Sequence, residues 1–249
     1  MKVFRKQRQQ LAADNNVIKY LRYAIGEILL VVIGILIALQ VNNWNQDYKN
    51  ARQELFYLQK LQENIAEDTS LFKERINEIN EAQEALKTIA MEMRNPSLKS
   101  FSIDISGPLT YTYGISLENA TWKNLMSTGK IDLIENKNLV DTLYSYYNHF
   151  SNNGNAQNQA VIDYTRNTVG PFLMKFDDIS FLIQSKSIIH YLGKTQQKSP
   201  YEYGKNVFIR NTIRLRYSFL SYLKSFYKSD NKRASHLIHE LSQEIQKSQ

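Results

Sequence analysis

Residues 23–42 read YAIGEILLVVIGILIALQVN, and this stretch decides the fold class of the first part of the chain. Ten of its twelve residues from Ile28 to Leu39 are Ile, Leu or Val. On a membrane-insertion scale each contributes about −0.3 to −0.6 kcal/mol, so the run favours insertion by roughly 3–6 kcal/mol. As a helix, residues 23–42 would span about 30 Å, the thickness of the hydrocarbon layer of a bilayer. The stretch therefore predicts one transmembrane helix.

Charged and aromatic residues flank this predicted span in the pattern of a membrane anchor. Residues 1–22 contain one acid, Asp14, against six basic residues, which are Lys2, Arg5, Lys6, Arg8, Lys19 and Arg22. Most of the net charge of +7 therefore lies on one side of the apolar stretch, which predicts a basic cytoplasmic tail. The expected anchors at the two interfaces are the aromatic residues Tyr20, Tyr23, Trp44 and Tyr48. A nucleic-acid-binding surface would instead spread its basic residues over a folded face, so nucleic acid is not an expected partner.

Two other interpretations of the apolar stretch are a cleaved signal peptide and the buried helix of a soluble domain. The residues that follow it, QVNNW at 40–44, contain no small-x-small cleavage site, and the preceding basic region is long. A buried helix of a soluble domain would not explain the one-sided charge. An uncleaved anchor is therefore the preferred interpretation.

One face of the predicted span carries an acid and two small residues. Glu27 lies about one turn inside the cytoplasmic edge, where it can reach water or pair with Arg22. Gly34 and Ala38 share its face at the spacing that lets two membrane helices approach closely. These residues predict packing of two copies through the membrane helix, although glycine and alanine are also common in membrane helices generally.

Residues 22–45 read RYAIGEILLVVIGILIALQVNNWN and follow Phe4-Arg5-Lys6. They resemble the opening of a family of uncharacterised single-pass membrane proteins of Gram-negative bacteria, which is classed as a domain of unknown function. A looser resemblance covers LMSTGKIDLIENKNL at 125–139 and LYSYY at 143–147. The resemblance implies an inner-membrane protein with its N-terminus in the cytoplasm and a helical periplasmic domain, and it carries no activity to transfer.

Residues 43–249 form the predicted extracytoplasmic domain. From Trp44 to Arg94 there is no glycine or proline, and strong helix formers dominate. Apolar residues recur there at a spacing of seven: Leu58, Ile65, Phe72, Ile79, Leu86 and Met93. The position three residues earlier is mixed: Leu55, Gln62, Thr69, Ile76, Gln83 and Ala90. This is weaker than a two-stranded coiled coil and predicts one helix from about Val17 to Arg94, packed along one stripe against other helices.

The remaining chain predicts an all-α bundle in which this long helix packs. Asn95-Pro96 ends the long helix, and Gly129 and Asn136 are expected to stop and to cap later helices. The first expected elements are a loop with a short extended piece at 99–114, helices at 117–127, 137–150 and 157–167, and an interruption at Gly170-Pro171. The later ones are one or two short helices at 176–191, a loop at 195–203 around Pro200, and a final helix or helix pair at 205–247 with a break at 229–231.

No catalytic, cofactor-binding or metal-binding residue is assigned from the sequence. His236, His239 and Glu240 share a helix face, but a site needs three or four ligands and the chain has no cysteine. A Gly-x-Ser-x-Gly nucleophile motif and a glycine-rich phosphate loop are both absent. Aromatic residues at 139–150 and 207–227 fit either a core or a binding groove.

Two functional hypotheses remain open at this point. The favoured one is a non-enzymatic, membrane-anchored module that binds a protein or a ligand outside the cytoplasm, as part of a sensor or an assembly. Its expected partners are the lipid bilayer, a second copy of the chain and an unidentified protein. The alternative is an envelope enzyme with an unrecognised helical active site, which predicts a concave pocket that holds at least two ionisable groups.

Overall fold

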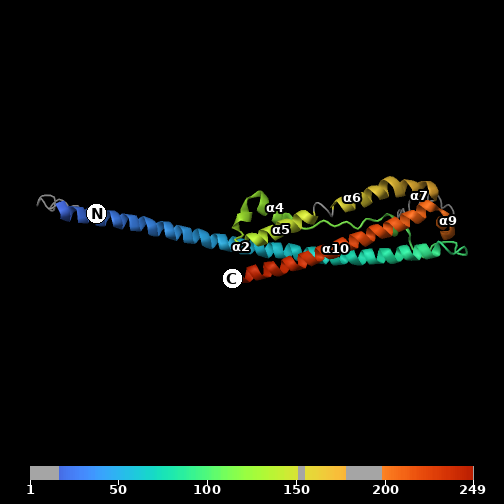
Figure 1. The fold of residues 1–249 in the computed structure, drawn as a ribbon, viewed down its shortest axis with the longest axis horizontal. Helices are drawn as coiled ribbons and strands as arrows, with labels where there is room; N and C mark the ends of the chain where they lie inside the picture. The colour runs from blue at the N-terminus through green and yellow to red at the C-terminus, as the bar shows by residue number, and fades with distance from the viewer. Residues whose placement is uncertain (1–16, 151–154, 178–197, 249) are drawn as a thin grey trace, which may run out of the picture. The chain divides into compact units, whose positions relative to one another are not determined.

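The computed structural model describes residues 17–150, 155–177 and 198–248 of the chain (Figure 1). Within these ranges every regular element is helical, which confirms the predicted all-α class. The chain divides into two compact units, Met1–Phe56 and Tyr57–Gln249.

The first long element, α2, runs without interruption from Val17 to Glu92. It confirms the long helix predicted from the sequence and ends two residues before Arg94. The apolar part of α2 contains an 18-residue window with a mean hydropathy of 2.6 and no buried residue. Its large apolar side chains are exposed, for example Ile28 at 63% and Leu36 at 59%. By length and composition this helix can cross a membrane.

The second long element, α10, is a single helix from Val207 to Lys247. It begins at Asn206, whose side chain accepts a hydrogen bond from the backbone N–H of Ile209. Its buried residues recur at steps of three and four along its whole length, as expected for a helix with one face in a core. The break predicted at 229–231 is wrong because Asp230 continues the buried stripe between Tyr227 and Ala234.

Helix α10 runs antiparallel to the part of α2 that lies in the second unit (Figure 1). Gln62 near the start of that part donates to Ser242 at 2.6 Å, and Gln83 near its end donates to Ser221 at 2.8 Å. These bonds explain the two glutamines at the mixed position in the seven-residue pattern, since both bind serine hydroxyls of α10. The apolar position forms the core: the exposed fraction is at most 1% for Leu58, Ile65, Phe72, Ile79 and Leu86.

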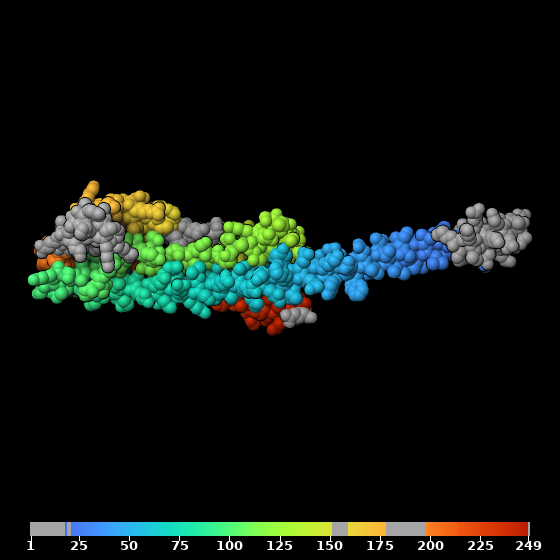
Figure 2. Space-filling view, turned by 180° about the vertical axis from the view of Figure 1, so that it is seen from behind, coloured from blue at the N-terminus to red at the C-terminus, as the bar shows by residue number. Residues whose placement is uncertain are grey.

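An extended segment follows the short helix α3 (Ser106–Thr110). This helix stands within the loop predicted at 99–114. Beyond it, buried residues alternate with exposed ones at Tyr113, Ile115 and Leu117. In Figure 2 the green residues of this part of the chain lie along the teal side chains of α2.

Side chains of α10 hold α3 and this extended segment through backbone carbonyl groups. Arg216, which is 1% exposed, donates to Pro108 O at 3.2 Å and to Tyr111 O at 2.6 Å. The hydroxyl of Tyr227 donates to Tyr113 O at 2.8 Å. An extended segment has no internal backbone hydrogen bonds, so these side chains satisfy carbonyl groups that burial would otherwise leave unpaired.

Three helical segments follow: α4 (Ala120–Ser127), the 3-10 helix η1 (Lys130–Leu133) and α5 (Lys137–His149). The first and third lie near the helices predicted at 117–127 and 137–150, whereas η1 was not predicted. Gly129 separates the first two with a φ of 69°, a conformation that glycine adopts without strain. Asn136 caps α5, because its side chain accepts from the N–H of Leu139. Asn136 also donates to Glu244 at 2.8 Å, so the start of α5 lies beside the end of α10.

Residues 155–176 are helical throughout, as α6 (Asn155–Tyr164), the π-helix η3 (Thr165–Val169) and α7 (Gly170–Phe176). The interruption predicted at Gly170-Pro171 is therefore wrong. Pro171 stands in the first turn of α7, where its missing N–H removes no hydrogen bond within the helix. The wider π-turn before it accommodates the proline ring.

A short helix, α9 (Pro200–Lys205), replaces part of the loop predicted at 195–203. Ser199 and Glu202 cap it reciprocally, each side chain accepting from the other's backbone N–H, with Pro200 in the first turn. The helices expected at 176–191 fall mostly outside the described residues.

Candidate functional site

The residues predicted to pack two membrane helices lie on α2 in the first unit. Gly34 and Ala38 are exposed, and Glu27 is partly exposed. A Cβ atom added to Gly34 would meet no atom within 4 Å. The small-residue face is thus open along the helix, and its use by a second copy stays a prediction.

The predicted interface anchors are exposed on the same helix, with Tyr23 at 51%, Trp44 at 73% and Tyr48 at 60%. The guanidinium of Arg52 lies over the ring of Tyr48, 5.9 Å from its centre. Arg22 is exposed as well. The structure describes the backbone but not the side chains of Lys19 and Tyr20, whereas Arg5, Lys6 and Arg8 lie outside the described residues.

His236 and His239 lie one turn apart on α10, whereas His149 lies on α5. His236 is 3.5 Å from Glu240 on α10, and His239 contacts Gln243 at 3.0 Å, both on the exposed side of the helix. His149 of α5 instead stacks on Phe226 with ring centres 5.7 Å apart. Within the described part of the chain, no three acidic or histidine side chains converge as a metal site requires.

The first buried acid of the second unit is Asp68 of α2, with an exposed fraction of 1%. One carboxylate oxygen accepts from the backbone N–H of Glu118 at 3.0 Å, and the other accepts from the hydroxyl of Tyr146 at 2.9 Å. Burial raises the pKa of Asp68 to about 6, although these two hydrogen bonds oppose the rise. Asp68 thus joins three segments, α2, the extended segment and α5.

The second buried acid is Asp230 of α10, with an exposed fraction of 2%. Neither of its oxygens accepts a hydrogen bond from the described residues. His149 lies 3.5 Å away and Arg233 lies 3.8 Å away. Burial raises the pKa of Asp230, and the nearby His149 and Arg233 oppose this.

Aromatic side chains surround the two buried acids. Trp122 stacks on Tyr147 with ring centres 5.2 Å apart and an angle of 16° between the planes. Phe72 contacts Phe150 and Tyr227, each with ring centres 5.9 Å apart. These aromatic residues are therefore core residues, which answers the choice between core and groove for this part of the pattern.

Sequence reasoning missed both buried acids. Asp68 stands in a third seven-residue position, whose other members include Leu61, Ala82 and Ile89, all buried. Asp230 stands at a spacing of three and four from buried neighbours in α10. A charged residue in a mostly apolar stripe was the available signal in both cases, although Arg75 of α2 and Arg216 of α10 stand in the same stripes.

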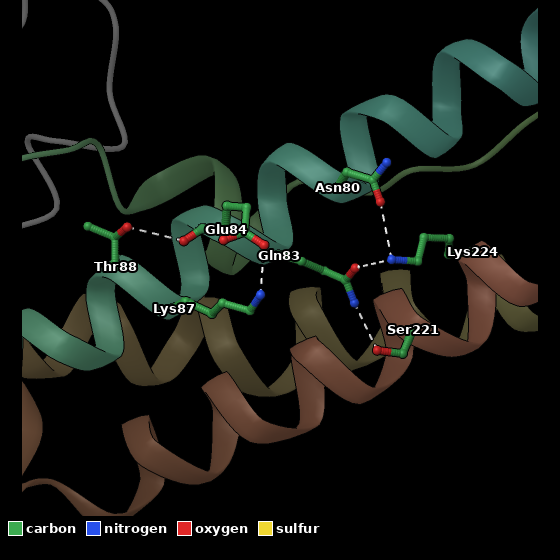
Figure 3. Close-up of polar contacts among 7 residues, drawn as sticks. All are labelled: Asn80, Gln83, Glu84, Lys87, Thr88, Ser221 and Lys224. Atoms are coloured by element: carbon green, nitrogen blue, oxygen red, sulfur yellow. Dashed lines mark hydrogen bonds and ion pairs between the residues drawn. The ribbon is translucent and has the colours of Figure 1, made fainter.

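A polar seam joins α2 to α10 in Figure 3. Lys224 donates to Asn80 at 3.1 Å and to Gln83 at 2.7 Å, and Gln83 in turn donates to Ser221 (Figure 3). One turn along α2, Lys87 pairs with Glu84 at 2.7 Å and lies over the ring of Tyr217 of α10, 6.0 Å from its centre. The seam fixes the register of the two helices. The partners of Lys224 are neutral amides, so they do not neutralise the positive charge of this lysine.

Toward the end of α2 the same two helices and α9 enclose a pocket of about 210 Å³. Its apolar part comes from Ala90, Met93 and Ile213, together with Gly204. Its polar part consists of three arginines, Arg94, Arg210 and Arg214.

Two of the three arginines of this pocket, which we call the arginine pocket, meet neutral partners in the described chain. Arg210 donates to Gly204 O at 3.1 Å, and Arg214 donates to Asn211 at 3.1 Å. Neither these two nor Arg94 forms an ion pair with a described carboxylate, and no acid lines the pocket. The site therefore combines apolar surface with a concentrated positive charge.

A second, more open hollow of about 440 Å³ carries negative charge instead. Its acids are Glu67, Asp68, Glu74 and Glu118. Both oxygens of Asp68 already accept hydrogen bonds from the protein. This arrangement fits a structural role for Asp68.

A comparison with protein families matches residues 27–192 to a family described as a family of unknown function, DUF6090. The match includes most of the apolar stretch and the region from α3 to α7. No curated protein and no solved structure matches the chain. Because the match covers well over half of the 249 residues, the chain belongs to the family of unknown function DUF6090.

Proposed function

We propose that this protein is a membrane-anchored binding module. The basic tail, residues 1–22, lies in the cytoplasm, residues 23–42 cross the bacterial inner membrane, and residues 43–249 form a periplasmic helical domain that binds a protein or a ligand. The observation that carries the proposal is the apolar part of α2, whose side chains are exposed although ten of the residues from Ile28 to Leu39 are Ile, Leu or Val.

Exposed apolar surface on this scale is unfavourable in water. A contiguous apolar patch on a soluble protein usually marks an interface or a lipid-facing surface. A helix whose apolar residues surround it completely is stable when lipid replaces water around it. The one-sided excess of basic residues before this stretch supports an orientation with the N-terminus in the cytoplasm.

The binding role rests on the arginine pocket of the second unit. It combines an apolar floor with donors that are not engaged by carboxylates of the described chain. Pockets that combine apolar surface with a few directed polar groups are typical of ligand sites. The alternative of an envelope enzyme has weaker support, since the acidic hollow is open and Asp68 is engaged in the fold.

The orientation is tested by labelling single cysteines, because the chain contains none of its own. Ser218→Cys places a thiol on the exposed side of α10, and Gln9→Cys places one in the basic tail. In spheroplasts, a membrane-impermeant maleimide should label Ser218→Cys at once and Gln9→Cys only after lysis. The intact mass of the labelled chain tests cleavage, and an alkaline carbonate wash should leave the protein in the membrane fraction.

The reverse labelling pattern, or release of the full-length chain by carbonate, would refute the anchored topology. The binding role is tested by cross-linking in native membranes. Recovery of a stoichiometric partner or of a bound ligand is the expected result. A chain that yields neither a partner, a second copy nor a ligand would contradict the binding role.

A further inference from the structure

The arginine pocket has the chemistry of a site for a small amphipathic anion, and this inference rests on the proposed binding function. Arginine presents a planar set of donors that matches a carboxylate in a bidentate manner. Three such groups lie around one apolar floor here. A ligand that satisfies both parts needs one carboxylate and an apolar chain.

The apolar floor depends on a close approach of α9 to the end of α2. A Cβ atom added at Gly204 would lie 2.2 Å from Met93 O, so only glycine permits this contact. Met93 is 6% exposed and Ile213 is 8% exposed, so the packed chain already buries most of the floor. Because the side chains of the floor are already packed before a ligand arrives, little conformational entropy is lost when a ligand binds.

The rim is formed by residues of different elements. Arg210 and Arg214 stand one turn apart on the same face of α10, whereas Arg94 follows the end of α2. Like charges at such spacing repel each other, and a bound anion relieves this repulsion. All three arginines are exposed, so water and salt partly screen this interaction.

The size of the pocket limits the ligand. A volume of about 210 Å³ is below the range of roughly 300–1,000 Å³ that is typical of sites for drug-sized molecules. A short aliphatic chain or a single apolar side chain fits this volume better than a long acyl chain. We propose that the arginine pocket binds an apolar monocarboxylate, either a short-chain acid or the C-terminal carboxylate of a peptide whose last residue is apolar.

The proposal is tested by calorimetric titration of the full-length protein in nanodiscs of zwitterionic lipid, with empty nanodiscs as the blank. The probes are acetate, butyrate and hexanoate, with hexanol as the uncharged analogue. Each methylene that enters the pocket should strengthen binding by up to about fourfold. Hexanol should bind at least about tenfold more weakly than hexanoate, because it lacks the charge-assisted hydrogen bonds.

Three variants assign the binding to this pocket. Arg210→Gln and Arg214→Gln should each weaken hexanoate binding by about tenfold or more. Ala90→Leu adds a side chain to the pocket without changing its charge and should weaken hexanoate more than acetate. Arg166→Gln is the control, since Arg166 is an exposed arginine of η3 outside the pocket and should bind hexanoate normally.

The source of the carboxylate is distinguished with N-acetyl-alanyl-leucine, which presents the same chemistry on a peptide. Tighter binding than hexanoate identifies a peptide terminus as the ligand, and weaker binding identifies a free acid. Equal affinity for hexanoate and hexanol, or equal loss of hexanoate binding in Arg166→Gln and Arg210→Gln, would overturn the proposal. These outcomes are independent of the labelling and carbonate results, so failure of the anchored topology and failure of the arginine pocket can be told apart.

Discussion

Replacing the buried carboxyl of Asp68 by an amide should remove the loss of unfolding free energy that ionisation of this carboxyl causes as the pH rises. Asp68→Asn keeps an oxygen that can accept from the N–H of Glu118, and its amide can donate to the hydroxyl of Tyr146. The variant therefore resembles the protonated acid at every pH. Both partners of Asp68 lie within hydrogen-bond distance, at 3.0 Å and 2.9 Å, so the substitution needs no rearrangement.

The magnitude follows from the pKa of Asp68, which burial raises from 3.8 to about 6 in the folded chain. A group whose pKa is higher in the folded state stabilises the fold fully below its unfolded pKa, and this contribution is lost as the pH rises through the folded pKa. One pKa unit corresponds to about 1.4 kcal/mol, so ionising Asp68 lowers the free energy of unfolding by up to about 3 kcal/mol at neutral pH. The loss falls between about pH 4 and pH 7.

The assay is urea unfolding of the full-length protein in nanodiscs between pH 4 and pH 7.5, followed by the fluorescence of Trp122. This residue is 7% exposed and stacks on Tyr147, so its emission reports on the core around Asp68. The Trp44→Phe background makes Trp122 the sole tryptophan, since the chain has two. Taking the difference between Asp68→Asn and wild type removes the pH dependence of every other group.

The difference in unfolding free energy should be smallest at pH 4 and should then rise in favour of Asp68→Asn by up to about 3 kcal/mol near pH 7.5. Asp141→Asn is the matched control, because Asp141 is an exposed aspartate of α5. Its difference from wild type should be nearly independent of pH. A flat difference curve for Asp68→Asn, or one that favours wild type as the pH rises, would refute the reasoning.

Three further substitutions test the packing of the chain. Gly204→Ala places a Cβ atom 2.2 Å from Met93 O and should lower the unfolding free energy by about 1–3 kcal/mol in the same urea titration. Gly107→Ala is the control and should have little effect, because no atom lies within 4 Å of its new Cβ. Arg216→Gln removes donors from buried carbonyl groups and should cost about 2–4 kcal/mol, with faster proteolysis of the extended segment. An unchanged cleavage rate would count against that anchoring role. Gly34→Ile should abolish self-association in bilayers measured by fluorescence energy transfer, and an unaltered dimer fraction would disprove packing through that face.

Local signals in the chain predicted the elements that depend on neighbouring residues. The absence of glycine and proline from Trp44 to Arg94 predicted the uninterrupted helix that α2 forms as far as Glu92. Asn136 was predicted as a cap and accepts from Leu139, and Gly129 was predicted as a stop and has a positive φ. These predictions succeeded because caps and helix propensity act over a few residues.

The wrong predictions share one physical cause. Ser229-Asp-Asn231 looked like a helix break, but Asp230 faces the core and the helix continues through it. Gly170-Pro171 looked like an interruption, but a π-turn before it keeps the segment helical. In both cases contacts or geometry outside the local residues outweighed a weak local preference.

The sequence by itself determined the all-α class, the extent of the first helix, and the apolar stretch with its one-sided charge, because each depends on residues close together in the chain. Only the tertiary structure decided that Asp68 and Asp230 are buried and that Arg94, Arg210 and Arg214 surround one pocket. Arg94 and Arg210 are separated by more than a hundred positions, and no local rule states which residues of two distant helices become neighbours. That pairing follows from the burial of two apolar stripes against each other, which only the folded chain specifies.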